Sequence, residues 1–125
     1  MTKEKVEIFE KLDVQFEGLH TEISIISKKS PNDALNKFKL KFVNQLLSKA
    51  NEILEEKYNP FDDFTIFNED EMPTNSDVVM VVTQYISCLE KFKFDNVKKE
   101  SGEWYWKLDN KEQIKTSRPP GKFTF

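Results

Sequence analysis

Residues 77–92 read DVVMVVTQYISCLEKF, and the fold depends on whether this stretch forms a helix or a strand. The five consecutive apolar residues at 78–82 would suit a buried strand equally well. The apolar positions then continue at helical spacing, for longer than a typical strand, through Tyr85, Ile86, Leu89 and Phe92. We therefore expect a helix whose first turns are covered by other elements on nearly all sides.

A long helix is predicted at the start of the chain, over residues 2–28. Its apolar side chains recur at alternating steps of three and four, at Phe9, Leu12, Phe16, Leu19, Ile23 and Ile26. This heptad spacing is typical of a helix packed on its own monomer, and it leaves open a homodimer through Phe9, Phe16 and Ile23. Because the run barely reaches the length at which heptads indicate a coiled coil, we expect a monomer.

A second helix is predicted to begin at Ser30 and Pro31, since serine can cap a helix and proline suits its first turn. It should end near Tyr58, because Pro60 disfavours helical geometry in the residue before it. Its apolar residues share one broad face, which Leu40, Val43 and Leu47 widen: Leu35, Phe38, Phe42, Leu46, Ala50, Ile53 and Leu54. A face this wide indicates contact with more than one neighbour.

The segment between the second and third helices, residues 59–75, has no regular period and is predicted to be a long loop. Six acids and no base lie within residues 59–77. We expect this loop to bind a protein with a basic surface, through Phe61, Asp62, Asp63, Phe64, Phe67, Glu69, Asp70 and Glu71. In the alternative, the phenylalanines fold inward as a lid over the helices and the acids are simply solvated.

A β-hairpin is predicted near the carboxyl end, at about residues 103–116, around an Asp-Asn turn. Trp104, Trp106 and Leu108 would face the helices, because an isolated hairpin is marginal in water. The alternative is a platform for single-stranded nucleic acid, made of Trp104, Tyr105, Trp106, Lys107, Lys111, Lys115 and Arg118. Residues 117–125 are expected to form an extended tail.

These elements predict a mainly α fold, a three-helix assembly with a C-terminal β-hairpin, which is α+β by strict count. The 125 residues are enough for one domain, which we assign to residues 1–116. The net charge of −3, from 19 bases and 22 acids, is unfavourable for general nucleic-acid binding.

Several chemistries lack the residues that they require. The single cysteine, Cys88, excludes a disulfide within the chain, and the single histidine, His20, excludes a histidine cluster for a metal. The three glycines stand apart, so no phosphate-binding loop can be built from them. We therefore expect no catalytic residue, no metal and no cofactor, and an enzyme would have to depend on an unrecognised carboxylate-based site.

The expected function is that of a small non-catalytic protein-binding module, such as a stoichiometric inhibitor, an immunity protein or an adaptor. The partner is expected to be another protein with a basic surface, rather than nucleic acid. Charges every few residues near the start are unlike a secretory signal, and no apolar run reaches the ~18 residues of a membrane span. These features, with the single cysteine, favour a cytoplasmic location without membrane contact.

Overall fold

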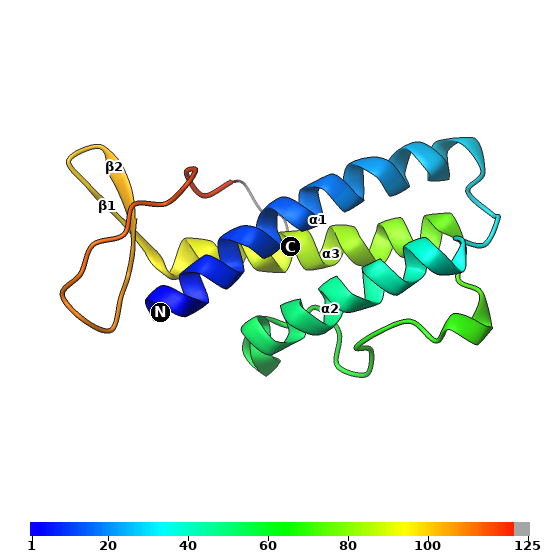
Figure 1. The fold of residues 1–125 in the computed structure, drawn as a ribbon, viewed down its shortest axis with the longest axis horizontal. Coiled ribbons are helices and arrows are strands. Elements are labelled where there is room, and N and C mark those ends of the chain that lie inside the picture. The colour runs from blue at the N-terminus through cyan, green and yellow to red at the C-terminus, as the bar shows by residue number, and fades with distance from the viewer. Residues whose placement is uncertain (122–125) are drawn as a thin grey trace.

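A computed structural model describes residues 1–121 as three helices followed by a two-stranded hairpin (Figure 1). The elements are α1 (Lys3–Lys29), α2 (Lys37–Tyr58), the short 3-10 helix η1 (Glu69–Glu71), α3 (Asn75–Asp95), β1 (Val97–Glu100) and β2 (Glu103–Trp106). The predicted fold class is confirmed. The end of the expected tail, residues 122–125, lies outside the described residues.

The stretch at 78–82 is helical and forms part of α3. Thr74 caps this helix by accepting a hydrogen bond from the backbone N–H of Asp77 at 3.2 Å. Val78 and Val82 are fully buried against the other two helices, but Met80 is 57% exposed. The expectation that the first turns of α3 are covered on nearly all sides is therefore wrong at Met80. Within residues 1–121, no helix is long and apolar enough to cross a membrane.

The heptad seam of α1 packs inside the monomer. Phe9, Phe16 and Ile23 are all at most 1% exposed. The ring of Phe9 stacks on Phe92 at a centroid distance of 5.6 Å, and that of Phe16 stacks on Tyr85 at 6.4 Å. These three side chains belong to the core that joins α1 to α3, so none of them is open to a second copy of the chain.

Helix α2 begins at Lys37, seven residues later than the predicted start at Ser30. The residues between pair their backbone with the segment before α3 instead: Leu35 N–H donates to the Pro73 carbonyl at 3.0 Å, and Asn75 N–H donates to the Asp33 carbonyl at 2.8 Å. This tertiary pairing overrides the local helix-start signal. Asn36 is the actual cap, accepting from the N–H of Lys39.

The predicted apolar face of α2 is only partly correct. Phe38 is 72% exposed and Phe42 is 44% exposed, so both lie on the solvent side of the helix. Most of the other predicted residues of the face, including those that widen it, are buried: Leu40, Val43, Leu46, Leu47, Ala50 and Leu54. The two phenylalanines contact each other edge to face, at a centroid distance of 5.0 Å.

The hairpin lies earlier in the chain than predicted. Strand β1 follows α3 directly and pairs antiparallel with β2, from Val97 opposite Trp106 to Glu100 opposite Glu103. Ser101 and Gly102 both have positive φ, the geometry that a two-residue hairpin turn requires. The segment after the Asp-Asn turn does pair with β2, through the bridge of Tyr105 with Lys115 and two backbone hydrogen bonds beside it, but it forms no strand. The predicted hairpin bounds of 103–116 are therefore wrong.

Candidate functional site

The three phenylalanines of the acidic loop turn toward the helices. Phe61, Phe64 and Phe67 are half-buried and pack against the core. Successive rings meet edge to face, with centroids 5.6 Å and 5.0 Å apart. Asn44 of α2 fixes the loop by donating to the Phe67 carbonyl at 3.0 Å and accepting from the Phe67 N–H at 2.9 Å. This is the arrangement of a lid, and it leaves the rings little surface for a partner.

The acids of the loop are all exposed but do not form one cluster. Asp62 lies near the end of α2, where it lines a recess together with Glu55 and Glu56. Glu71 lies at the other end of the loop, beside Asp77 in the first turn of α3. The predicted set of eight contact residues is therefore divided between an inward-facing aromatic cluster and two separate acidic surfaces.

A hollow of about 420 Å³ lies between the lid and α3. Apolar side chains line most of it and the only charges are acidic, from Phe64, Ile66, Phe67, Asn68, Glu71, Pro73, Asp77, Met80 and Val81. Two of these apolar side chains are substantially open to solvent, Ile66 at 45% and Met80 at 57%. Met72, which lies between the lining residues Glu71 and Pro73, is 61% exposed. We call this surface, with Met72, the methionine hollow.

The backbone at Met72 has an unusual conformation. With φ 50° and ψ 62° it is left-handed, a region that costs a non-glycine residue roughly 1 kcal/mol or more. Met72 ends η1, and its N–H donates to the Glu69 carbonyl at 3.3 Å. At the start of η1, the side chain of Asn68 accepts from the N–H of Asp70. The turn that exposes Met72 is thus held at both ends by hydrogen bonds.

Of the residues of the methionine hollow, the predicted site included only Phe64, Phe67 and Glu71. The exposed apolar residues Ile66, Met72 and Met80 were not predicted to belong to a site. Sequence reasoning assigned Met80 to the core because it stands inside a run of valines. The available signal was chemical, since Met80 is the one unbranched residue in that run and Met72 directly follows three acids. Flexible methionines beside acids are typical of adaptable binding surfaces.

The second predicted site, on the hairpin, does not form a stacking platform. Trp106 is 1% exposed and donates its ring N–H to Glu10 at 2.9 Å. Trp104 and Tyr105 are half-buried, and the ammonium group of Lys99 lies over the Trp104 ring, 5.8 Å from its centroid. Three of the four predicted cations have partners within the chain: Lys107 donates to the Asp95 carbonyl, Lys115 pairs with Glu103, and Arg118 pairs with Asp13. The fourth, Lys111, is exposed.

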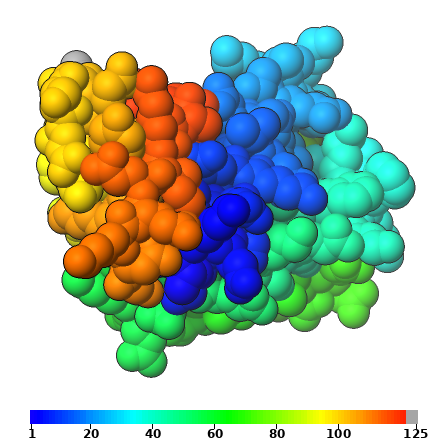
Figure 2. Space-filling view, turned by 60° about the vertical axis from the view of Figure 1, so that its left-hand side comes forward, coloured from blue at the N-terminus to red at the C-terminus, as the bar shows by residue number. Residues whose placement is uncertain are grey.

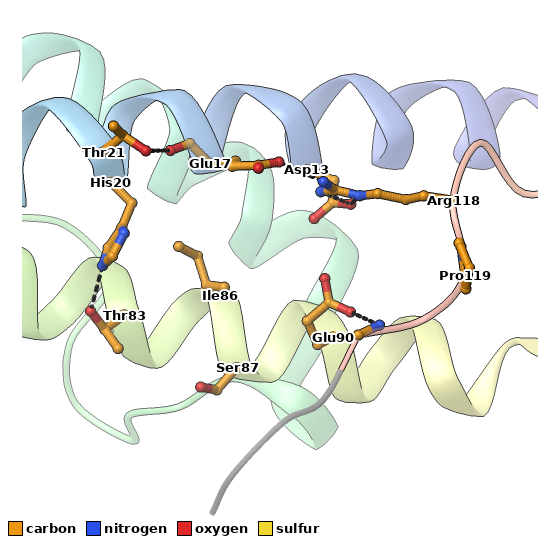
Figure 3. A pocket seen from close by; sticks show the side chains of 11 residues that line it. Asp13, Glu17, His20, Thr21, Thr83, Ile86, Ser87, Glu90, Arg118 and Pro119 are labelled. Atoms are coloured by element: carbon orange, nitrogen blue, oxygen red, sulfur yellow. Dashed lines mark hydrogen bonds and ion pairs between the residues drawn. The ribbon is translucent and has the colours of Figure 1, made fainter.

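A polar pocket lies between α1, α3 and the segment after Thr116 (Figure 3). Arg118 bonds Asp13 and Glu17, and these hydrogen bonds to the two carboxylates, that with Asp13 first, raise the pKa of Arg118. Glu90 accepts from the Gly121 N–H at 2.8 Å, and His20 bonds Thr83 at 3.1 Å. Because these groups bond one another, they do not converge on a common point for a ligand.

Neither the potential metal ligands nor comparison with known proteins indicates another candidate site. Within residues 1–121, no group of three or more His, Cys, Asp or Glu side chains could hold a metal ion. No family model, curated protein or solved structure matches the chain. The methionine hollow, with its exposed apolar side chains and acidic border, is therefore the candidate site.

Proposed function

We propose that the chain is a non-catalytic protein-binding module, of the inhibitor, immunity-protein or adaptor kind, whose methionine hollow takes a basic amphipathic segment of a partner. The observation that carries this proposal is the exposure of Ile66, Met72 and Met80 around a hollow whose only charges are acidic. Exposed apolar side chains gathered at one place, with a charged border, are typical of interaction surfaces.

The charge of this region specifies the kind of partner. Between Lys57 and Lys91 the sequence has seven acids and no lysine or arginine. Such a field speeds the encounter with a basic surface and disfavours an acidic one. The partner segment is therefore expected to carry lysine or arginine beside its apolar residues.

The apolar side chains specify how the segment would be held. Methionine is unbranched and flexible, so Met72 and Met80 can adjust to side chains of several shapes. The lid, which forms one wall of the hollow, is fixed by the hydrogen bonds of Asn44 and Asn51 to the loop backbone. A fixed wall opposite adjustable side chains favours a helix with one apolar stripe, in the way that grooves bind amphipathic helices.

A cytoplasmic location is part of the proposal. It is supported by the single cysteine, Cys88, which lies in the core and is 5% exposed. Burial raises the pKa of the Cys88 thiol, which makes it a poor nucleophile and consistent with a packing role.

The test uses a labelled helical peptide of about 18 residues, with leucine along one stripe and lysine elsewhere, and measures its binding by fluorescence anisotropy at low salt. The Asp70→Lys/Glu71→Lys variant should bind it about tenfold more weakly than the parent. The control, Asp62→Lys/Asp63→Lys, changes the net charge by the same amount on the other acidic surface. It should bind nearly as tightly as the parent.

A second variant, Met80→Gln, tests the apolar contribution without a change of charge. Met80 is 57% exposed, so the substitution should leave the melting curve unchanged and weaken the peptide several-fold. Equal weakening by both charge reversals, with no effect of Met80→Gln, would show only general attraction to an acidic chain. That result would remove the methionine hollow as the site.

A further inference from the structure

A second groove lies on a different side of the molecule, between α1 and α2. It measures about 470 Å³ and is lined by Lys5, Ile8, Lys11, Leu12, Gln15, Lys49, Glu52 and Ile53. Its floor is apolar, since Leu12 is 1% exposed and Ile53 packs against the core. Figure 2 shows the first turns of α1, in blue, beside the green end of α2.

Exposed apolar side chains continue the groove along α2. Phe42 precedes Lys49 and Ile53 by seven and eleven residues, the spacing that keeps helical residues on one face. Phe42 is 44% exposed and Phe38, one turn before it, is 72% exposed. On the α1 side, Ile8 is 51% exposed. The groove and this stripe run from Lys5 to the ion pair between Glu22 and Lys39, about 25 Å along α1 at 1.5 Å per residue.

The border of this groove has the opposite charge to the methionine hollow. Its charged residues are three lysines, Lys5, Lys11 and Lys49, and a single acid, Glu52. None of these three lysines has an ion pair among those found in the described residues. Positive charge around an apolar floor is complementary to a segment that carries acids beside its apolar residues.

We propose that this groove docks an amphipathic helix with an acidic polar face, supplied by a partner protein. Helices α1 and α2 run antiparallel, and α3 packs against both of them. A helix in the groove would also contact both α1 and α2, as an additional member of the bundle. Its apolar stripe would cover Ile8, Phe42 and Ile53, and its acids would meet the lysines. A stretch of about 25 Å accommodates a helix of roughly 17 residues.

The shape of the groove favours a helix over a lipid surface. A flat bilayer would meet only the exposed side chains at the border, whereas a row of side chains on a helix can enter the hollow of about 470 Å³ between α1 and α2. The ridge of side chains on a helix fits between two parallel ridges below it. This inference is separate from the proposed function, because it concerns another face with the opposite charge.

The experiment uses a labelled peptide of about 18 residues with leucine along one stripe and glutamate elsewhere, together with a scrambled peptide of the same composition. Binding to the full chain is measured by fluorescence anisotropy, and the site is mapped from backbone amide NMR shifts. We expect the amides of Ile8, Gln15 and Lys49 to shift while those of β1 stay unchanged. The scrambled peptide should bind at least about tenfold more weakly, because it lacks the apolar stripe.

Two matched variants test the lysines. Lys11→Glu/Lys49→Glu should weaken the glutamate peptide about tenfold or more, whereas Lys98→Glu/Lys99→Glu, with the same change of net charge on β1, should have little effect. If the first variant fails to fold, Ile8→Gln replaces it, since Ile8 is 51% exposed and its loss should also weaken the peptide several-fold.

Three outcomes would overturn the inference. The first is that both peptides bind equally or that neither binds at about 1 mM. The second is that the shifted amides lie outside the groove. The third is that vesicles of phosphatidylserine and phosphatidylcholine bind through Lys11 and Lys49 while the glutamate peptide does not, which would assign this face to an anionic lipid surface instead.

Discussion

At the scale of single residues, Tyr58 shows how one partly buried hydroxyl links stability to pH. It ends α2 and donates a hydrogen bond to Asp95 of α3 at 2.8 Å. Burial, and then the hydrogen bond to Asp95, raise the pKa of Tyr58 from 10.0 to about 12. A hydrogen bond from Lys91, and then that from Tyr58, lower the pKa of Asp95, so the acceptor stays charged.

The sign of the pH effect follows from this raised pKa. The folded state holds the Tyr58 proton more tightly than the unfolded state, so this contribution is complete below pH 10 and is lost between pH 10 and about 12. Tyr58→Phe should be less stable than the parent by about 1 kcal/mol near pH 8, and the difference should narrow above pH 10. Urea unfolding at several pH values measures this, with Tyr105→Phe as the control. A difference that stays constant up to pH 11.5 would contradict the prediction.

At the scale of elements, α2 contains a local distortion near its end. Glu55 has φ 53° and ψ −168°, a non-helical conformation inside the helix. This region of backbone space is essentially reserved for glycine, and it costs another residue about 1–3 kcal/mol. The helix continues beyond it, since the Asn59 N–H still donates to the Glu55 carbonyl at 3.1 Å.

Glu55→Gly should therefore stabilise the protein by about 1 kcal/mol, because the relief of strain exceeds the extra freedom that glycine gives to the unfolded chain. Glu52→Gly is the control, one turn earlier in regular helix, and it should destabilise by about 1 kcal/mol. Thermal melts of the two variants measure the contrast. Equal destabilisation by both substitutions would show that Glu55 is not strained.

The elements predicted correctly from the sequence are those in which the spacing of the apolar side chains shows which face of the helix is buried. The steps of three and four from Phe9 to Ile23 define the buried seam of α1, and the run through Leu89 defines α3. The prediction failed where distant backbone decides the outcome, as when Leu35 pairs with Pro73 and delays α2. The polar strand β1 has no apolar alternation to reveal it.

Contacts between distant residues also decide which side chains form the candidate site. The acids of residues 59–77 were recognisable from composition, and both readings of the phenylalanines could be stated. Whether Met80 faces solvent depends on which side of α3 the lid covers, and that is set by the hydrogen bonds of Asn44 with Phe67. Such tertiary contacts between α2 and the loop leave no local pattern in the sequence.

At the scale of the whole molecule, the two ends of the described chain are joined. The hairpin and the amino terminus lie at the same end of the helices (Figure 1). The Met1 amine donates to the Lys107 carbonyl at 3.1 Å, and Glu10 accepts from both the Trp106 ring at 2.9 Å and the Ser117 N–H at 3.0 Å. The segment after β2 therefore holds α1 in place as well as covering it.

Arg118 makes a further connection between α1 and the segment after β2. Its guanidinium bonds the carboxylate of Asp13, 105 positions earlier, at 2.6 Å and 3.2 Å. Asp13 is only 7% exposed, and a buried carboxylate that loses its partner retains its desolvation cost. Because the Arg118 side chain is 40% exposed, solvent screens part of the interaction.

Arg118→Ala should therefore destabilise the protein by about 1–3 kcal/mol, less than the loss of a fully buried pair. Asp13→Asn in the same chain should recover part of that loss, because the neutral amide no longer needs a cation. Lys115→Ala is the control, since its pair with Glu103 is exposed, and it should change stability little. Urea unfolding of the single and double variants gives the coupling between Asp13 and Arg118 directly. Additive effects of the two substitutions would show that this contact does not stabilise the closure of the chain, and that the segment from Ser117 to Gly121 is held by its other hydrogen bonds.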